Sequence, residues 1–177
     1  MIVIFAIEMA AVTGQATRGT TSHFNVKEPL DGLIFAIMGI AIALNTLLVA
    51  AIMVQYFRTE TDLPVAVLWG MRLGLLIFLL GSVQGGYMSA QLAHTVGGSD
   101  GGPGLPLTNW STQAGDLRVA HFLGLHGLQA IPLAAVVLNR IFSSRATFLT
   151  VVFTLVYFVF FSFLFIQALM GRPLIAL

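Results

Sequence analysis

The sequence predicts an all-α integral membrane protein. We expect one transmembrane helical domain over residues 1–177, built as a bundle of five transmembrane helices of which the first is short. Two observations predict this class. Of the 177 residues, 58% are hydrophobic and only 8% are charged, whereas a soluble domain uses about 25% charged residues to cover its surface. Apolar runs also recur at roughly the 20 residues that a helix needs to cross a hydrocarbon core of about 30 Å.

The composition also excludes several other classes. A net charge of +1 does not supply the clustered Lys and Arg that nucleic-acid binding needs. The absence of cysteine excludes disulfides, thiolate metal sites and cysteine nucleophiles. The sequence contains no Ser-x-x-Lys or His-Glu-x-x-His motif, so the catalytic chemistry that these motifs serve is not expected, and a non-enzymatic role is favoured.

The first apolar stretch, residues 1–16, predicts a short helix. It covers only about 24 Å at the helical rise, and it lacks the basic start and the small-residue cleavage site of a signal peptide. A membrane helix that begins at an initiator methionine is unusual. We therefore expect either a native start further upstream or a helix that a neighbouring chain completes.

Four complete spans follow the first stretch. Each is bounded by a charge or by a helix breaker such as Pro64 or Gly171. The predicted helices cover residues 32–57, 65–95, 117–138 and 148–170.

Alternating crossings sort the connecting segments onto two faces of the membrane. Residues 17–30, residues 96–115 and the C-terminus share one face, called the outer face here. We expect the Gly-rich segment 96–115 to form a longer structured turn over the helix ends, and the opposite, inner face to have short turns. Basic residues are divided too evenly between the faces to set the orientation, although the tight basic turns of the inner face favour a cytoplasmic location.

Several polar residues fall near the middle of the predicted spans, where an unsatisfied polar group costs a few kcal/mol. Glu8 and Arg72 have opposite charges at similar depth, so we expect them to pair with each other, or one of them to pair with His126. The alternative is an ion pair that only fixes the order of the helices. The predicted midplane polar site consists of Glu8, Asn45, Arg72, His126 and Tyr157.

A second concentration of polar residues lies towards the outer face. At 100° per residue, Arg118 and Gln129 lie on one stripe of the fourth span, flanked by His121 and His126. We expect such a stripe to face the bundle interior and not lipid. The predicted outer polar cluster consists of Arg18, His23, Lys27, Asp116, Arg118 and Gln129.

The histidines permit a cofactor hypothesis. His94 and His121 are expected at similar depth on neighbouring helices, where they could hold a b-type haem iron axially, with His126 as a further ligand and Arg118 or Arg18 near a propionate. The alternative is that each histidine only donates a hydrogen bond between helices. His121 and His126 diverge by about 140° on their helix, so no metal site is predicted from this pair.

Two spans have a distinctive packing pattern. The third contains Gly70, Gly74, Gly81 and Gly85, a spacing that lets another backbone approach closely in lipid. The fifth is aromatic on all sides and nearly free of polar groups, so we expect it to face lipid or a hydrophobic subunit.

Three functions are compatible with these features. The first is a multipass membrane protein that handles a small ligand or ion, for example in transport, through a polar site in the bundle and at its outer face. The alternatives are a haem- or pigment-binding redox subunit and a structural membrane subunit of a larger complex. The expected partners are the lipid bilayer and either further copies of the chain or the other subunits of a membrane complex, and the expected location is the cell (inner) membrane.

Overall fold

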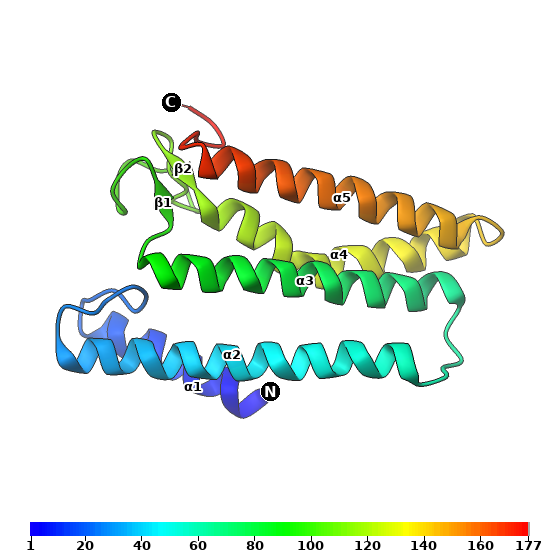
Figure 1. The fold of residues 1–177 in the computed structure, drawn as a ribbon, viewed down its shortest axis with the longest axis horizontal. Coiled ribbons are helices and arrows are strands. Elements are labelled where there is room, and N and C mark those ends of the chain that lie inside the picture. Colours follow the sequence, from blue (N-terminus) through cyan, green and yellow to red (C-terminus); the bar gives the residue numbers. More distant parts are fainter. Residues whose placement is uncertain (177) are drawn as a thin grey trace.

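The computed structural model describes residues 1–176 and confirms the predicted all-helical class. Within this range five helices run roughly parallel to one axis (Figure 1). The only sheet in the described part of the chain is an antiparallel pair of two-residue strands, β1 (Thr95–Val96) and β2 (Gly115–Asp116). The helices are α1 (Ile2–Thr17), α2 (Pro29–Arg58), α3 (Val65–Gln91), α4 (Leu117–Ile141) and α5 (Ala146–Leu169).

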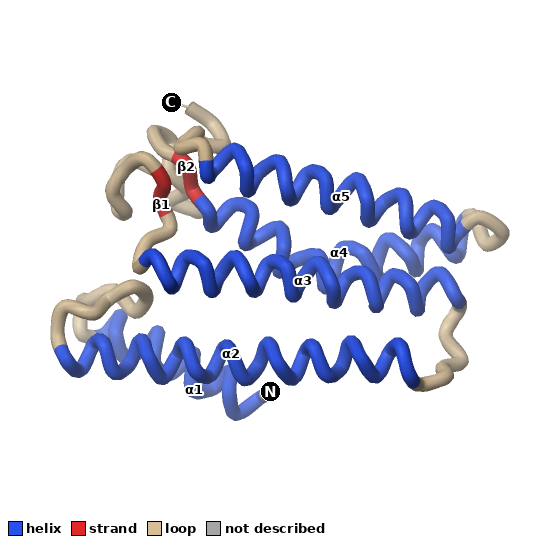
Figure 2. Tube along the Cα trace, in the orientation of Figure 1, coloured by secondary structure: helices blue, strands red, loops and turns tan. Residues whose placement is uncertain are grey.

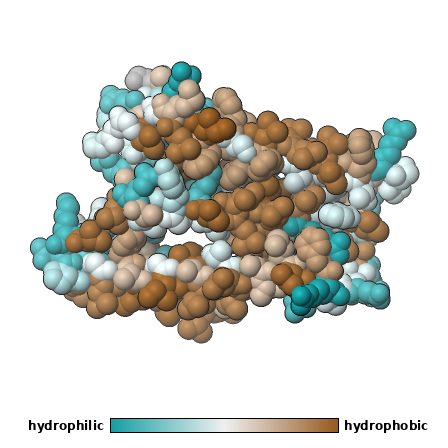
Figure 3. All heavy atoms as spheres, viewed as in Figure 1, coloured by the Kyte–Doolittle hydropathy of each residue, from teal (hydrophilic) through white to brown (hydrophobic). Residues whose placement is uncertain are grey.

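Within residues 1–176, α2, α3, α4 and α5 are the four helices long and apolar enough to cross a membrane, whereas α1 is shorter. Both long connections lie at the same end of the bundle as the last described residues, and the two short turns lie at the opposite end (Figure 2). This arrangement agrees with the expected outer and inner faces. The hydrophobic surface along the helices in Figure 3 is consistent with contact with lipid tails.

The predicted end of the third helix at residue 95 is wrong. Helix α3 ends at Gln91, because Leu92 adopts a left-handed conformation with φ of 54°, which terminates a helix. His94 therefore lies in the loop and not on the helix. At the start of α4, the Asp116 side chain accepts a hydrogen bond of 3.0 Å from the backbone N–H of Arg118, which is an ordinary N-terminal cap.

The closest helix contact lies between α3 and α4 and confirms the packing predicted from the α3 glycines. A Cβ built on Gly70 would lie 2.5 Å from the Cβ of Ala135, and one on Gly74 would lie 2.9 Å from the carbonyl oxygen of Gly127. These separations are too short for any side chain, so the glycines allow the two backbones to touch. In a bilayer, where apolar burial alone does not drive helix association, such contacts supply much of the packing energy.

The helices α1 and α2 pack less tightly against the rest of the bundle. Helix α1 packs mainly on α2, and α2 mainly on α3. In the space-filling view an opening remains between α2 and α3 (Figure 3). The molecule thus consists of a tightly packed unit of α3, α4 and α5, and the α1–α2 pair contacts this unit mainly through α2 and α3.

Candidate functional site

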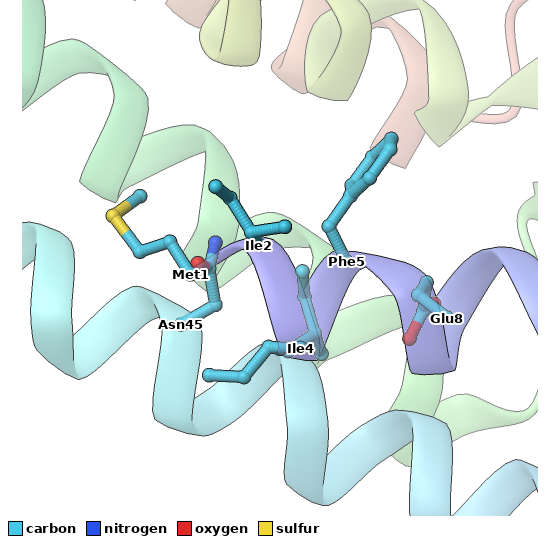
Figure 4. Close-up of a pocket in the computed structure, with 7 residues that line it drawn as sticks. Met1, Ile2, Ile4, Phe5, Glu8 and Asn45 are labelled. Atoms are coloured by element: carbon cyan, nitrogen blue, oxygen red, sulfur yellow. The ribbon is translucent and has the colours of Figure 1, made fainter.

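The candidate site lies between α1 and α2. A cavity of about 340 Å³ is lined by apolar residues of both helices and by two polar ones, Glu8 and Asn45. Figure 4 shows Met1, Ile4 and Asn45 gathered between the two helices, with Glu8 one turn beyond Ile4 on α1. The structure therefore brings together two of the five residues of the predicted midplane site.

Glu8 is the unusual residue of this cavity. Its Oε2 atom is buried and has no hydrogen-bond partner among residues 1–176. Its Oε1 atom lies 3.9 Å from Nε2 of His23, a residue of the α1–α2 loop. This separation is longer than a hydrogen bond, so the two groups are neighbours and not a fixed pair.

Arg72 does not form the expected ion pair with Glu8 or with His126. Its Nε donates a hydrogen bond of 2.9 Å to the carbonyl oxygen of Tyr56, and its guanidinium lies 4.7 Å from the ring centre of Phe57 and 5.4 Å from that of Trp69. The carbonyl of Tyr56 belongs to the last turn of α2, where backbone carbonyls lack helical partners. Arg72 thus caps a neighbouring helix, and this local partner replaces the distant carboxylate.

The other two predicted midplane residues also lie apart from Glu8. The Tyr157 hydroxyl donates a hydrogen bond of 2.7 Å to the carbonyl oxygen of Leu123, which ties α5 to α4. His126 lies on an exposed side of α4, where its ring stacks against Phe122 with ring centres 4.0 Å apart. The predicted single midplane site therefore divides into separate places.

Gln129 and His126 of the α4 polar stripe face outward, so the expectation that the stripe faces the interior is wrong for these two residues. Gln129 and His126 are exposed, whereas Gly124 and Gly127 on the other side of α4 are buried against α3. Close backbone contact requires the glycine side of α4 to face α3. Gln129 and His126, on the opposite side of α4, therefore point away from α3.

At the outer face, the exposed Arg18 side chain bonds to a group of buried polar residues that connects α1 to α2. Its Nη1 lies 2.5 Å from Oδ1 of Asp31 and also bonds to the side-chain oxygen of Gln15. Gln15 and Asn25 donate further hydrogen bonds of 3.1 and 2.9 Å to the same carboxylate. Gln15 and Asn25 were not predicted for this site, because pairing across a loop leaves no spacing signal in the sequence. Lys27 of the predicted cluster is exposed.

Arg118 and Asp116 form the second outer network. Arg118 Nη2 donates hydrogen bonds of 2.7 Å to Oδ2 of Asp116 and 2.6 Å to the carbonyl oxygen of Asn109. Burial by itself raises the pKa of the Asp116 carboxyl, but the hydrogen bonds from Arg118 and from the Ser111 N–H outweigh burial and leave that pKa below its ordinary value. This network joins the Gly-rich loop to the start of α4, which agrees with the expected structured turn.

Three histidines, His23, His94 and His121, lie close to these two networks. His23 and His94 each lie beside Phe24, with ring centres 6.2 Å away in both cases. Burial, and then the charge of His121, lower the pKa of His23. Burial, and then the charge of Arg118, lower the pKa of His94 in spite of the opposing effects of Asp100 and Asp116. Both rings are therefore expected to be neutral near pH 7.

The geometry gives no support to the haem hypothesis. The Nδ1 of His121 donates a hydrogen bond of 2.8 Å to the carbonyl oxygen of Gly81, and its ring fills the space above Gly85. The Nδ1 of His94 lies 3.1 Å from the Thr95 hydroxyl. Both candidate propionate partners, Arg18 and Arg118, already bind carboxylates of this chain.

Within residues 1–176 no group of three or more His, Asp or Glu side chains is placed to hold a metal ion.

Comparisons of the chain with protein-family models, with curated proteins and with solved structures find no match. The fold and the sites nevertheless define a class. Four long apolar helices fit a multipass membrane protein, with polar networks fastening its outer end and a carboxyl group in an apolar cavity.

Proposed function

We propose that this multipass membrane protein handles an ion, and that the ion is a proton taken up and released by Glu8. The observation that carries the proposal is the buried Oε2 of Glu8, which has no hydrogen-bond partner in the described part of the chain, residues 1–176. A carboxylate in apolar surroundings without a counter-ion is strongly disfavoured, so it binds either a proton or a cation.

The coordination chemistry of the cavity favours the proton over a metal cation. Hard cations such as Mg²⁺ or Ca²⁺ need about six or more oxygen ligands. The cavity offers side-chain oxygens from Glu8 and Asn45 only. A proton needs a single carboxylate oxygen, and the site supplies that.

His23 supports a route between Glu8 and the outer face. It is half-exposed and lies 3.9 Å from the Glu8 carboxylate. Its pKa is lowered by burial and by His121, so near neutral pH the imidazole is uncharged and able to accept a proton from either side. His23 therefore connects the aqueous loop region to the carboxyl group in the cavity.

The test is proton flux in proteoliposomes that contain the full chain and an internal pH-sensitive dye, driven by a potassium diffusion potential. We expect flux above that of empty vesicles for the wild type, background flux for Glu8→Gln, and slower flux for His23→Gln. Glu60→Gln, an exposed carboxyl on the α2–α3 turn, is the matched control and should behave as wild type. Equal flux for wild type and Glu8→Gln, or no wild-type flux above empty vesicles, would overturn the proposal.

A chemical readout tests the same site without transport. Dicyclohexylcarbodiimide reacts with protonated carboxyl groups in apolar surroundings, and mass spectrometry locates the adduct. We expect labelling at Glu8 and none at Glu60. Absence of labelling at Glu8 in the folded protein at neutral pH would contradict proton binding there.

A further inference from the structure

Helix α4 presents polar side chains on a surface that no other described element covers. Gln129 and His126 are exposed and lie 60° apart around the helix. Phe122 and Leu133, which are 50% and 65% exposed, flank them on the same side. These four residues are called the α4 polar face below.

The depth of this face makes its exposure costly in a membrane. Gln129 lies 12 residues from both Leu117 and Ile141, the two ends of α4, which is about 18 Å from either end. It is therefore at the centre of a helix long enough to cross the bilayer, where lipid offers no hydrogen bonds. A carboxamide at this depth needs a protein partner.

The hydrogen-bonding groups of the face are complementary to one another. Nδ1 of His126 lies 2.8 Å from the carbonyl oxygen of Phe122. Because a carbonyl only accepts, Nδ1 carries the hydrogen, and in that tautomer Nε2 is an acceptor. Gln129 offers two N–H donors and one oxygen acceptor, and its side chain has no hydrogen-bond partner among residues 1–176.

We propose that the α4 polar face is the contact between two copies of this chain. Two copies with the same orientation in the membrane, related by a two-fold axis along the bilayer normal, bring the same residue of each copy together. Each Gln129 then donates one N–H to the carboxamide oxygen of Gln129 in the second copy. The other N–H lies within about one helical turn of His126 Nε2 in the second copy.

A second copy fits this face better than lipid or an unrelated apolar helix does. The carboxamide of Gln129 is both a donor and an acceptor, so an identical group pairs with it through one hydrogen bond in each direction, whereas an apolar helix leaves it unpaired. Phe122 and Leu133 supply the surrounding apolar contact. The proposal does not depend on proton handling at Glu8, which lies on α1.

The absence of cysteine from the sequence makes disulfide crosslinking a clean test. Leu133→Cys places a thiol on the α4 polar face, and Val156→Cys places one on an equally exposed position of α5, 64% exposed. In bilayers that contain the full chain, we expect oxidation to produce dimers from Leu133→Cys and not from Val156→Cys. Equal yields at the two positions, or no dimer from Leu133→Cys, would refute the α4 contact.

The role of the Gln129 carboxamide is tested in two ways. The first measures the yield of crosslinked dimer in the same Leu133→Cys background. The second measures the dimer dissociation constant from energy transfer between labelled copies at decreasing protein-to-lipid ratios. Gln129→Leu should raise the dimer dissociation constant on the order of tenfold, and Gln129→Asn should retain most of the affinity. An unchanged dissociation constant for Gln129→Leu contradicts the proposed hydrogen bonds. A purified chain that stays monomeric in bilayers, while Leu133→Cys crosslinks to a different protein in native membranes, contradicts a second copy as the occupant.

Discussion

Gly81 of α3 and Gly124 of α4 face each other so closely that neither position has room for a methyl group. A Cβ on Gly81 would lie 2.7 Å from the carbonyl carbon of Gly124, and a Cβ on Gly124 would lie 2.6 Å from Cα of Gly81. Backbone atoms limit the space at both positions, so rotating a side chain cannot relieve the clash. The two helices would have to separate along their most extensive contact.

Gly81→Ala and Gly124→Ala should therefore each destabilise the protein, by about 1–3 kcal/mol. Gly86→Ala is the matched control on α3, because nothing lies within 4 Å of its Cβ position, and alanine there slightly favours the helix. Thermal unfolding in one detergent measures all three variants. A Gly81→Ala variant as stable as Gly86→Ala would be evidence against the close α3–α4 contact.

Arg72 supports a second prediction, because among the described residues 1–176 its partners are a backbone carbonyl and two aromatic rings. Arg72→Met keeps much of the side-chain volume but removes the hydrogen bond to Tyr56 and the contacts with the Phe57 and Trp69 rings. We expect a loss of about 1–3 kcal/mol in unfolding free energy. Glu8→Gln should change stability independently of Arg72→Met, and a double-mutant cycle that couples the two would indicate an ion pair instead.

The spans were predictable from the sequence, but the relative depth and the neighbours of the polar residues were not. Counting from the ends of the apolar runs placed Glu8 and Arg72 at comparable depth, whereas Glu8 lies beside Asn45 in the middle of α2 and Arg72 bonds to Tyr56 in its last turn. Counting gives no information on which helix lies beside each residue. Arg72 instead caps the last turn of α2, which follows from the short α2–α3 turn and from the unpaired carbonyls at a helix end.

The direction of the α4 polar stripe was predictable in principle. The sequence places Gly124 and Gly127 opposite Arg118 on the helix, and in lipid the small residues mark the side that packs. In a soluble helix the position of the polar residues decides which side faces outward. The prediction that the polar side of α4 faces the bundle interior relied on the polar residues and not on the glycines. The end of α3 had no comparable signal, because the residue that turns the chain is Leu92 and not a glycine.

The Asp31 network supports a third prediction, on the attachment of α1. Asp31 accepts hydrogen bonds from Gln15, Arg18 and Asn25, so Asp31→Ala removes the common partner of α1 and the loop. We expect protease cleavage within residues 18–28 to become faster, on the order of tenfold. Glu28→Ala, which removes a neighbouring exposed carboxylate, should leave the cleavage rate unchanged. Equal rates for Asp31→Ala and wild type would mean that α1 is held by other contacts.

The stability of the outer loop that contains His94 should depend on pH. The charged groups near His94 are Asp100, Asp116 and Arg118, and burial together with Arg118 lowers its pKa below the ordinary value of about 6.5. The unfolded segment therefore binds more protons than the folded one as the pH falls below about 6.5, so acid destabilises the folded loop. The effect of one histidine cannot exceed about 1.4 kcal/mol per pH unit.

Trp110 lies in the same loop, so its fluorescence during unfolding in denaturant at pH 7.5 and at pH 5 measures this loss directly. His23 shifts in the same direction, so His94→Gln should reduce the pH dependence and the double variant with His23→Gln should reduce it further. Stability that rises on acidification, or a pH dependence unchanged in the double variant, would contradict the assignment. The direction of the stability change follows from the lowered histidine pKa. Above the ordinary pKa the histidine is neutral in both states and the loop keeps its full stability. As the pH falls towards the folded-state pKa, the unfolded loop binds protons first, and the folded loop loses stability.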